Sequence, residues 1–157
     1  MMAKPNQKIK VLFVCLGNIC RSTMAEAVLR HMVRQAGLEE RVAVDSAGTG
    51  DYHIGEPPHK GTRKILEREG IPWEGITARQ ICRADLDDFT YIIGMDEENL
   101  RRIRRLSAPE HEERLHLLSD FAEGDWTQVP DPWYTGDFHL TYQLVEDGCK
   151  GLMKALL

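Results

Sequence analysis

Residues 9–14 (IKVLFV) form a nearly continuous apolar run, and the spacing of apolar residues becomes helical soon after it. A run of this kind, rich in β-branched side chains, is typical of a parallel strand buried on both faces. Beyond a turn that holds Gly17 and Asn18, apolar side chains recur at Met24, Val28, Leu29, Met32 and Val33. Gly37 follows as a C-cap. Strand, short loop and helix together predict the first half of a βαβ unit.

The same alternation continues along the chain. Further strands are predicted over 41–45, 89–95 and 115–118, and helices over 62–69, 97–106 and most of the last twenty residues. Residues 119–137 are expected to be a loop, and Gly148 and Gly151 are expected to weaken the last helix. The pattern predicts an α/β fold: a three-layer, doubly wound, four-stranded parallel sheet of the flavodoxin-like kind. Cys15, Ser46 and Asp96 are then expected at one edge of that sheet.

Length and composition limit the alternatives. The chain has 157 residues, which predicts a single domain over 1–157, with 1–7 as a flexible tail. A net charge of −5 gives no basic field for nucleic acid or an anionic membrane. The basic run at 101–105 is interpreted as the solvated last turn of a helix. No apolar stretch could span a bilayer, no signal peptide is evident, and four cysteines do not form a dense framework, so a reducing, cytoplasmic location is expected.

The loop after the first strand carries the chemistry. It reads C-L-G-N-I-C-R-S from Cys15 to Ser22. A loop between a strand and a helix can turn its backbone N–H groups inward and bind a phosphate dianion with the helix dipole behind it. The guanidinium of Arg21 can hold two phosphate oxygens. The same field favours a nucleophilic thiolate at Cys15, to which Ser22 could donate a hydrogen bond.

Two readings of this loop stay open on local pattern alone. The Cys15–Arg21 spacing is weak by itself, and a cysteine that ends a core strand is often only a small buried hydrophobe. A phosphatase also needs a proton donor for the leaving oxygen. Asp131 in V-P-D-P-W-Y fits that role and has Trp133 and Tyr134 beside it, although an aspartate before proline is common in turns.

Taken together, these residues resemble the low-molecular-weight protein-tyrosine phosphatase family. The matching blocks are V-C-L-G-N-I-C-R-S with M-A-E-A, then S-A-G-T at 46–49, A-R-Q at 78–80, M-D at 95–96 and D-P-W-Y at 131–134. They follow the family's order and cover nearly the whole chain. The chain departs from the family where Trp133 replaces a frequent tyrosine and where no histidine precedes A-R-Q.

The resemblance implies the phosphotyrosine phosphatase I-like fold, no metal and no cofactor. It implies Cys15 as nucleophile, Arg21 as phosphate clamp and Asp131 as general acid and base, with Ser46 as a supporting residue. The substrate would be a phosphotyrosine-containing protein or a small aryl phosphate. Cys20 could form a reversible disulfide with Cys15, or simply pack in the core. Residues expected to contact substrate are Leu16, Gly17, Asn18, Ile19, Cys20, Ser22, Tyr52, Trp133 and Tyr134.

Three rival functions remain. Arsenate reductases on this scaffold use further cysteines near the third strand, and residues 92–96 contain none. Protein-arginine phosphatases resemble the same scaffold but favour threonine where this chain has Ile19, which favours phosphotyrosine here. A non-catalytic phosphate-binding or redox-sensing module would keep Arg21 but would not need Asp131. The six histidines show no metal-ligand spacing and are expected at the surface or behind the site.

Overall fold

The computed structural model describes residues 8–157, so the predicted flexible tail at 1–7 lies outside the described residues. Its centre is a sheet of parallel strands in the order β2-β1-β3-β4. The strands are β1 (Ile9–Cys15), β2 (Val42–Gly48), β3 (Tyr91–Gly94) and β4 (Leu115–Leu117). The predicted four-stranded parallel sheet is confirmed.

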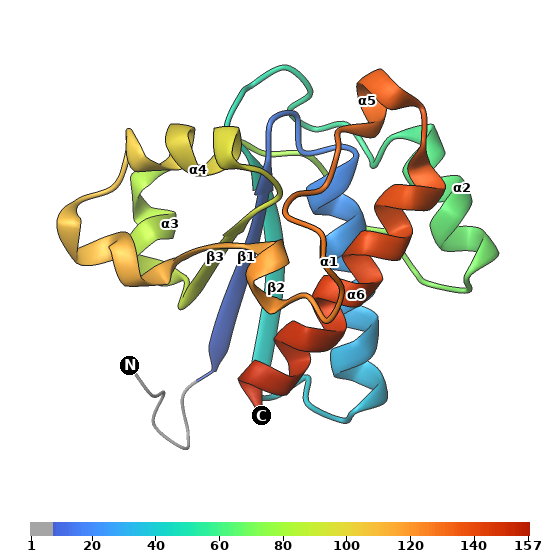
Figure 1. The fold of residues 1–157 in the computed structure, drawn as a ribbon, viewed down its shortest axis with the longest axis horizontal. Coiled ribbons are helices and arrows are strands. Elements are labelled where there is room, and N and C mark those ends of the chain that lie inside the picture. The colour runs from blue at the N-terminus through green and yellow to red at the C-terminus, as the bar shows by residue number, and fades with distance from the viewer. Residues whose placement is uncertain (1–7) are drawn as a thin grey trace.

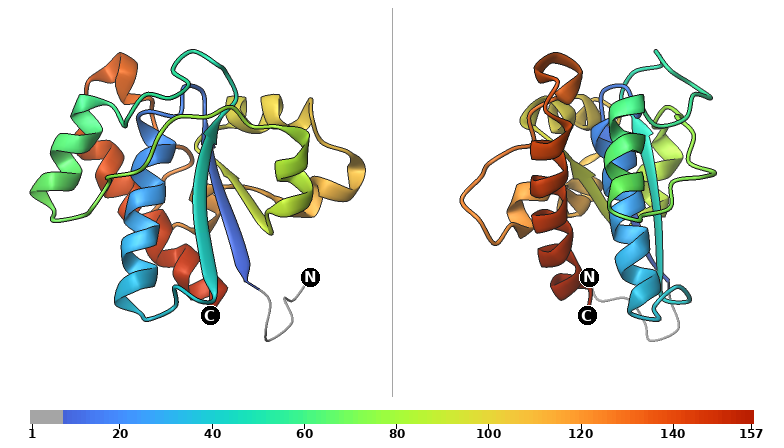
Figure 2. Two further views of the ribbon diagram at one scale, coloured as in Figure 1. Left: turned by 180° about the vertical axis from the view of Figure 1, so that it is seen from behind. Right: turned by 90° about the vertical axis from the view of Figure 1, so that its right-hand side faces the viewer.

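Helices cover both faces of the sheet (Figure 1). They are α1 (Arg21–Gln35), α2 (Lys60–Arg68), α3 (Arg83–Asp88), α4 (Glu97–Arg104), α5 (Pro132–Thr135) and α6 (Phe138–Leu156), with 3-10 turns η1 (Pro109–Arg114) and η2 (Leu118–Phe121). Helices α1 and α6 pack together on one face, and α3 and α4 lie on the other; the turned views in Figure 2 show the three layers. The predicted doubly wound architecture is confirmed.

Strand β1 is buried on both faces, as its apolar run predicts. Val11 and Phe13 belong to the core beneath α1 and α6, whereas Leu12 and Val14 belong to the core beneath α3 and α4. All four side chains are completely buried. Burial of a side chain of this size stabilises a fold by about 1.5–3 kcal/mol. The strand that carries Cys15 is therefore anchored from both sides.

Several boundaries differ from the predicted ones. Helix α3 is an addition to the predicted helices, because its sequence RADLDD has one long apolar side chain and no helical period. It is stabilised at its start, where the Asp85 carboxylate accepts the Cys82 backbone N–H. The predicted strand over 89–95 is shorter because Phe89 ends α3. The predicted loop over 119–137 contains most of η2 and all of α5, which Asp131 caps and Pro132 begins.

The expectation that two glycines weaken the last helix misses why they are there. A Cβ on Gly151 would lie 1.7 Å from the Phe121 carbonyl oxygen, and one on Gly148 would lie 2.4 Å from Leu118 Cγ. Glycine therefore lets α6 touch η2 directly. This close contact fixes the path of the chain that leads to Asp131.

The basic run at 101–105 ends a helix, as the sequence predicts. It forms the last turn of α4 and its C-cap residue, and Arg101 and Arg102 pair with Glu98. None of the helices within residues 8–157 combines the length and apolar composition that a membrane crossing requires.

Candidate active site

The loop between β1 and α1 turns sharply around the Cys15 sulfur. Asn18 has φ of 56°, in the left-handed region that asparagine adopts more readily than most residues. Helix α1 begins after Cys20, whose side chain accepts no capping hydrogen bond, so the first N–H groups of the helix point into the loop. Cys15 lies at the floor of the loop and is buried. Its sulfur accepts the Asn18 backbone N–H at 3.3 Å.

Behind the sulfur, a buried polar network holds the loop. The Asn18 Nδ2 group donates to Ser22 Oγ at 2.7 Å and to Ser46 Oγ at 2.9 Å. Ser22 Oγ lies 3.0 Å from Cys15 Sγ. Asn18 Oδ1 accepts the backbone N–H of Arg79. The segment that lacks the family's histidine thus still supplies a hydrogen bond to the loop, through its backbone.

Arg21 is a buried cation with a fixed orientation. One terminal nitrogen donates to Asp96 Oδ2 at 2.6 Å and to the Val129 carbonyl at 3.0 Å, and the other lies 3.4 Å from Asp131 Oδ2. Among the described residues, nothing accepts from its buried Nε–H. Burial opposes the charge, but Cys15 and the carboxylates of Asp96 and Asp131 raise the pKa of Arg21 on balance. The Nε–H of the guanidinium is therefore a buried donor without an acceptor among the described residues.

Asp131 stands at the N-terminus of α5, where two contacts orient its carboxylate. Oδ1 accepts the Trp133 backbone N–H at 3.0 Å, and Oδ2 faces Arg21. Its side chain remains partly open to solvent, unlike that of Arg21. A carboxylate held in this way can exchange a proton with a bound group.

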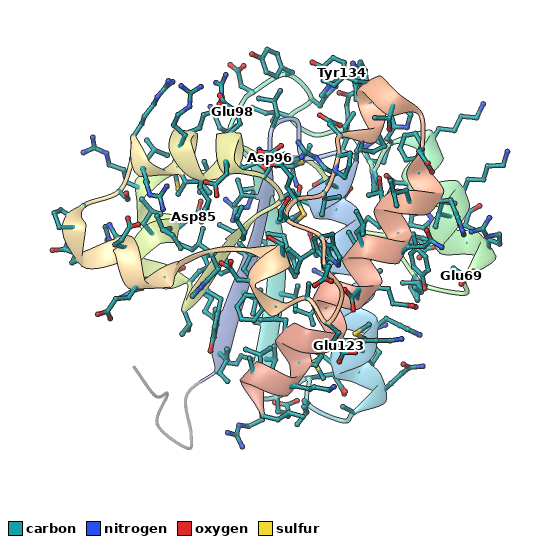
Figure 3. The ribbon with its side chains drawn as sticks, in the orientation of Figure 1. Glu69, Asp85, Asp96, Glu98, Glu123 and Tyr134 are labelled. Carbon is teal, nitrogen blue, oxygen red and sulfur yellow. The ribbon has the colours of Figure 1, made fainter. Side chains whose placement is uncertain are left out.

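Cys15 and Asp131 line a cavity of about 410 Å³, whereas Arg21 is buried and does not line it. Its exposed wall consists of Tyr52, Trp133 and Tyr134, and Figure 3 shows Tyr134 projecting from α5 above the level of Asp96. Of the predicted substrate-contacting residues, Asn18 and Ser22 are fully buried behind the cavity. The others line it, together with Cys15 and Asp131; they are Leu16, Gly17, Ile19, Cys20, Tyr52, Trp133 and Tyr134.

A comparison with protein families decides which family this site belongs to. The family model described as low molecular weight phosphotyrosine protein phosphatase matches residues 10–157. The chain belongs to this family. Members of the low molecular weight phosphatase family are phosphoric monoester hydrolases, and this chain is an enzyme of that class.

Individual relatives of this phosphatase agree over nearly the whole chain. The low molecular weight protein-tyrosine-phosphatase YfkJ of Bacillus subtilis is 50% identical over 149 residues, 94% of this chain and 96% of the relative. The crystal structure of YfkJ matches with a TM-score of 0.94 at 48% identity, over 97% of this chain and 96% of that one. The structure titled DARP, drosophila arginine phosphatase, matches with a TM-score of 0.86 at 30% identity, over 94% and 97%.

The second cysteine of the phosphatase loop lies in an apolar environment. Cys20 is buried, and burial together with Cys15 and Asp131 raises its pKa to about 12. All four cysteines are free, so the expected Cys15–Cys20 disulfide is not formed here. Cys20 is a protonated thiol that packs against Ile19 and Ala78.

Some residues of the site are not recognisable from the sequence pattern above. Asp96 is marked in the sequence by its place after a strand and by the M-D block, but neither predicts its contact with Arg21. The D-x-x-N spacing to Asn99 marks a helix cap. His53 lines the cavity, and its ring centroid lies 5.6 Å from that of Trp133. Its position next to Tyr52 is the only feature of the sequence that points to this place in the site. Glu26 lies within the M-A-E-A block and contacts Ser46 from behind.

One histidine cluster lies elsewhere in the phosphatase. Asp87, Glu110 and His111 place three potential ligand atoms within 4.8 Å of one another. His111 Nδ1 accepts the Ala108 backbone N–H, and Nε2 contacts Asp87. Both ring nitrogens thus have partners within the protein, and the cluster ties η1 to α3.

Proposed function

We propose that this protein hydrolyses phosphotyrosine in proteins, or small aryl phosphates, through a phosphocysteine intermediate. The observation that carries the proposal is the buried Arg21 guanidinium, which contacts Asp131, adjoins Cys15 and keeps its Nε–H without a protein acceptor among the described residues. That arrangement places a phosphate clamp between a nucleophile and a proton donor.

In the first step, the Cys15 thiolate attacks phosphorus opposite the leaving oxygen. The S–P bond forms as the P–O bond to the aryl group breaks. The loop N–H groups and Arg21 hold the equatorial oxygens, which carry the charge in the transition state. Protonated Asp131 transfers its proton to the departing oxygen, and the product leaves as a phenol.

In the second step, the Asp131 carboxylate accepts a proton from water, whose oxygen attacks phosphorus. The new P–O bond forms as the S–P bond breaks, and inorganic phosphate is released. The departing group is the Cys15 thiolate, and the Ser22 hydroxyl at 3.0 Å can donate to it. No metal is needed, because Arg21 and the backbone supply the positive field.

The walls of the cavity support an aromatic phosphate. Tyr52, Trp133 and Tyr134 are more than half exposed, so a phenyl ring can pack between them. Ile19 lines the same cavity and is 7% exposed. A guanidinium beside its apolar side chain would lose hydrogen bonds, which favours phosphotyrosine over phosphoarginine although a relative of this fold is titled an arginine phosphatase.

The free thiols support action in a reducing compartment such as the cytoplasm, because Cys15 must be reduced to attack. Arsenate reduction finds no support, since Cys82, the cysteine preceding β3, is exposed and does not line the cavity.

Hydrolysis of a series of aryl phosphates tests the proposal. Cys15→Ser should abolish turnover, whereas Cys82→Ser, at the exposed cysteine, should retain it. Asp131→Ala should lose more activity as the leaving group becomes poorer, since a good leaving group needs no proton. Turnover by Cys15→Ser at the wild-type rate would refute the mechanism. Equal effects of Asp131→Ala on all leaving groups would show that Asp131 is not the general acid.

The rates of hydrolysis of phosphotyrosine and phosphoarginine peptides test the substrate class. Ile19→Thr should shift the ratio of these two rates.

A further inference from the structure

A buried carboxyl group lies behind the loop from Cys15 to Ser22, here called the phosphate loop, and takes no part in the proposed chemistry. Glu26, in the second turn of α1, is 3% exposed. One carboxyl oxygen, Oε1, accepts the Ser46 hydroxyl at 2.6 Å. The other, Oε2, pairs with Arg30 at the edge of the protein. A buried carboxyl is costly unless both its oxygens are bound, and here both are.

With Glu26 ionised, the donors and acceptors behind the loop can be assigned in only one consistent order. The Asn18 Nδ2 group has two protons and no lone pair to offer, so it donates to both Ser46 and Ser22. Ser46 accepts a hydrogen bond from Asn18 and so donates its own O–H to Glu26. Ser22 also accepts from Asn18, which leaves its proton for the Cys15 sulfur.

The order depends on the charge of Glu26. An ionised carboxylate is a pure acceptor and holds the Ser46 proton, so the Ser46 lone pair faces Asn18. A protonated carboxyl would place its proton on the oxygen facing Ser46, because Arg30 offers only donors to the other oxygen. The Ser46 hydroxyl would then lose its strong acceptor. Hydrogen bonds in such a chain strengthen one another, so the loss also weakens the hydrogen bond that Asn18 donates to Ser22.

We propose that Glu26 is a positioning residue whose ionised carboxylate, acting through Ser46 and Asn18, directs the Ser22 hydroxyl toward the Cys15 thiolate. The inference rests on the proposed phosphocysteine mechanism, because the hydroxyl matters most when the thiolate departs from phosphorus. It adds a proton-dependent control to the site from a residue that lines no part of the cavity.

The surroundings of Glu26 raise its pKa toward neutral pH. Burial raises the pKa of Glu26 to about 7, against the lowering effect of Ser46 and Arg30. Asp45 on β2 raises it further, and Arg79, ahead of α3, lowers it. Arg79 is itself bound to Asp45 and Asp85. The charge on Glu26 is thus set by groups from α1, from β2 and from the segment before α3.

Nuclear magnetic resonance of the protein tests this series of hydrogen bonds without an activity measurement. The side-chain amide signals of Asn18 should shift as pH passes through about 7 in the wild type. That inflection should vanish in Glu26→Gln, which cannot titrate, and persist in Glu40→Gln, the same change at an exposed glutamate. An unchanged Asn18 inflection in Glu26→Gln would overturn the proposal.

Ser46→Ala provides a second test should Glu26→Gln fail to fold. It keeps Glu26 and Arg30 but removes the link to Asn18, so the Asn18 signals should no longer follow Glu26. An Asn18 inflection of wild-type size in Ser46→Ala would equally refute the proposal.

Turnover gives the functional counterpart. Under saturating aryl phosphate at pH 8, kcat of Glu26→Gln should fall by about tenfold, the loss of one hydrogen bond to a charged group. The difference from wild type should shrink toward pH 5.5, where wild-type Glu26 is protonated. A kcat ratio independent of pH would contradict this role. Absence of aryl phosphatase activity in the wild type would instead refute the proposed function, and the Asn18 signals would still test the positioning chain.

Discussion

The phosphate loop and the aromatic rim form the floor and the wall of one cavity, yet they are built in opposite ways. Asn18, Arg21 and Ser22 are buried, and the side chains of Asn18 and Arg21 bind partners from distant parts of the chain. Tyr52, Trp133 and Tyr134 are more than half exposed and lie on short segments. A charge that develops in a transition state requires fixed dipoles, whereas an aromatic ring needs only apolar surface. We therefore expect changes in the loop to affect kcat and changes in the rim to affect KM.

The largest effect is expected at Arg21. In Arg21→Lys the charge remains, but the planar fork that we propose to bind two phosphate oxygens is lost, and the Val129 carbonyl loses its donor. We expect kcat/KM for an aryl phosphate to fall by about 10³-fold or more. Arg101→Lys, the same change at an exposed arginine, should leave it unchanged. Near-normal activity of Arg21→Lys would show that charge alone suffices in the loop.

The next effect concerns the stability of the loop's support. The pKa of Glu26 is raised from 4.5 to about 7, so the folded state holds this proton more tightly than the unfolded chain. Its contribution to stability is complete below pH 4.5 and is lost as pH rises through 7. The loss amounts to about 3 kcal/mol over that interval. Denaturant unfolding at pH 5 and pH 7.5 should show this decline in wild type, and Glu26→Gln should lack it. Equal pH dependence in both would place the titration elsewhere.

A smaller effect is expected where the loop is held indirectly. Asp96→Asn keeps an oxygen to cap Asn99 but removes the negative charge that orients Arg21. We expect kcat/KM to fall by about 10- to 100-fold, mainly through kcat, since a charged hydrogen bond contributes about 1.5–3 kcal/mol. Asp137→Asn makes the same change at the cap of α6 and should have little effect on activity. Equal losses in both variants would mean that the cap, not Arg21, is responsible.

The smallest effect belongs to the rim. Trp133→Ala removes a ring that contacts His53 and His59 at 5.6 Å between centroids. We expect KM for an aryl phosphate to rise by less than about tenfold, because one aromatic contact contributes about 0.5–1.5 kcal/mol, with kcat almost unchanged. An alkyl phosphate should show no change in KM. A large loss of kcat would place Trp133 with the loop rather than the rim.

The structure could be predicted from the sequence where it depends on local patterns of residues. Apolar runs predict the strands because their side chains are buried on both faces, as in β1. The loop is predictable because its residue types and spacing are local, from Cys15 to Ser22. Helix α3 escapes prediction because its few residues carry no period. Helix α5 was missed although Asp131, Pro132 and Gly136 supply an N-cap, a first residue and a left-handed end.

The supporting residues could not be predicted in the same way. Glu26 carries no local sign that it is buried, since a glutamate in a helix is usually exposed. Its contact with Ser46 exists only because α1 packs on β2. The hydrogen bond from Arg79 to Asn18 joins residues far apart along the chain and uses the backbone, which no side-chain pattern reveals. Tertiary packing decides these contacts.

The packing of α6 on α1 has a consequence for synthesis of the protein. Helix α1 leaves the ribosome well before Val145, Cys149 and Leu152 of α6, which share its core. Until they emerge, the apolar face of α1 lacks its cover, and Asp131 has no fixed place beside Arg21. The core that α1 and α6 share therefore cannot form until α6 has been made. A nascent chain that carries the complete phosphate loop is consequently not yet an active phosphatase, and a chain truncated before α6 should be insoluble.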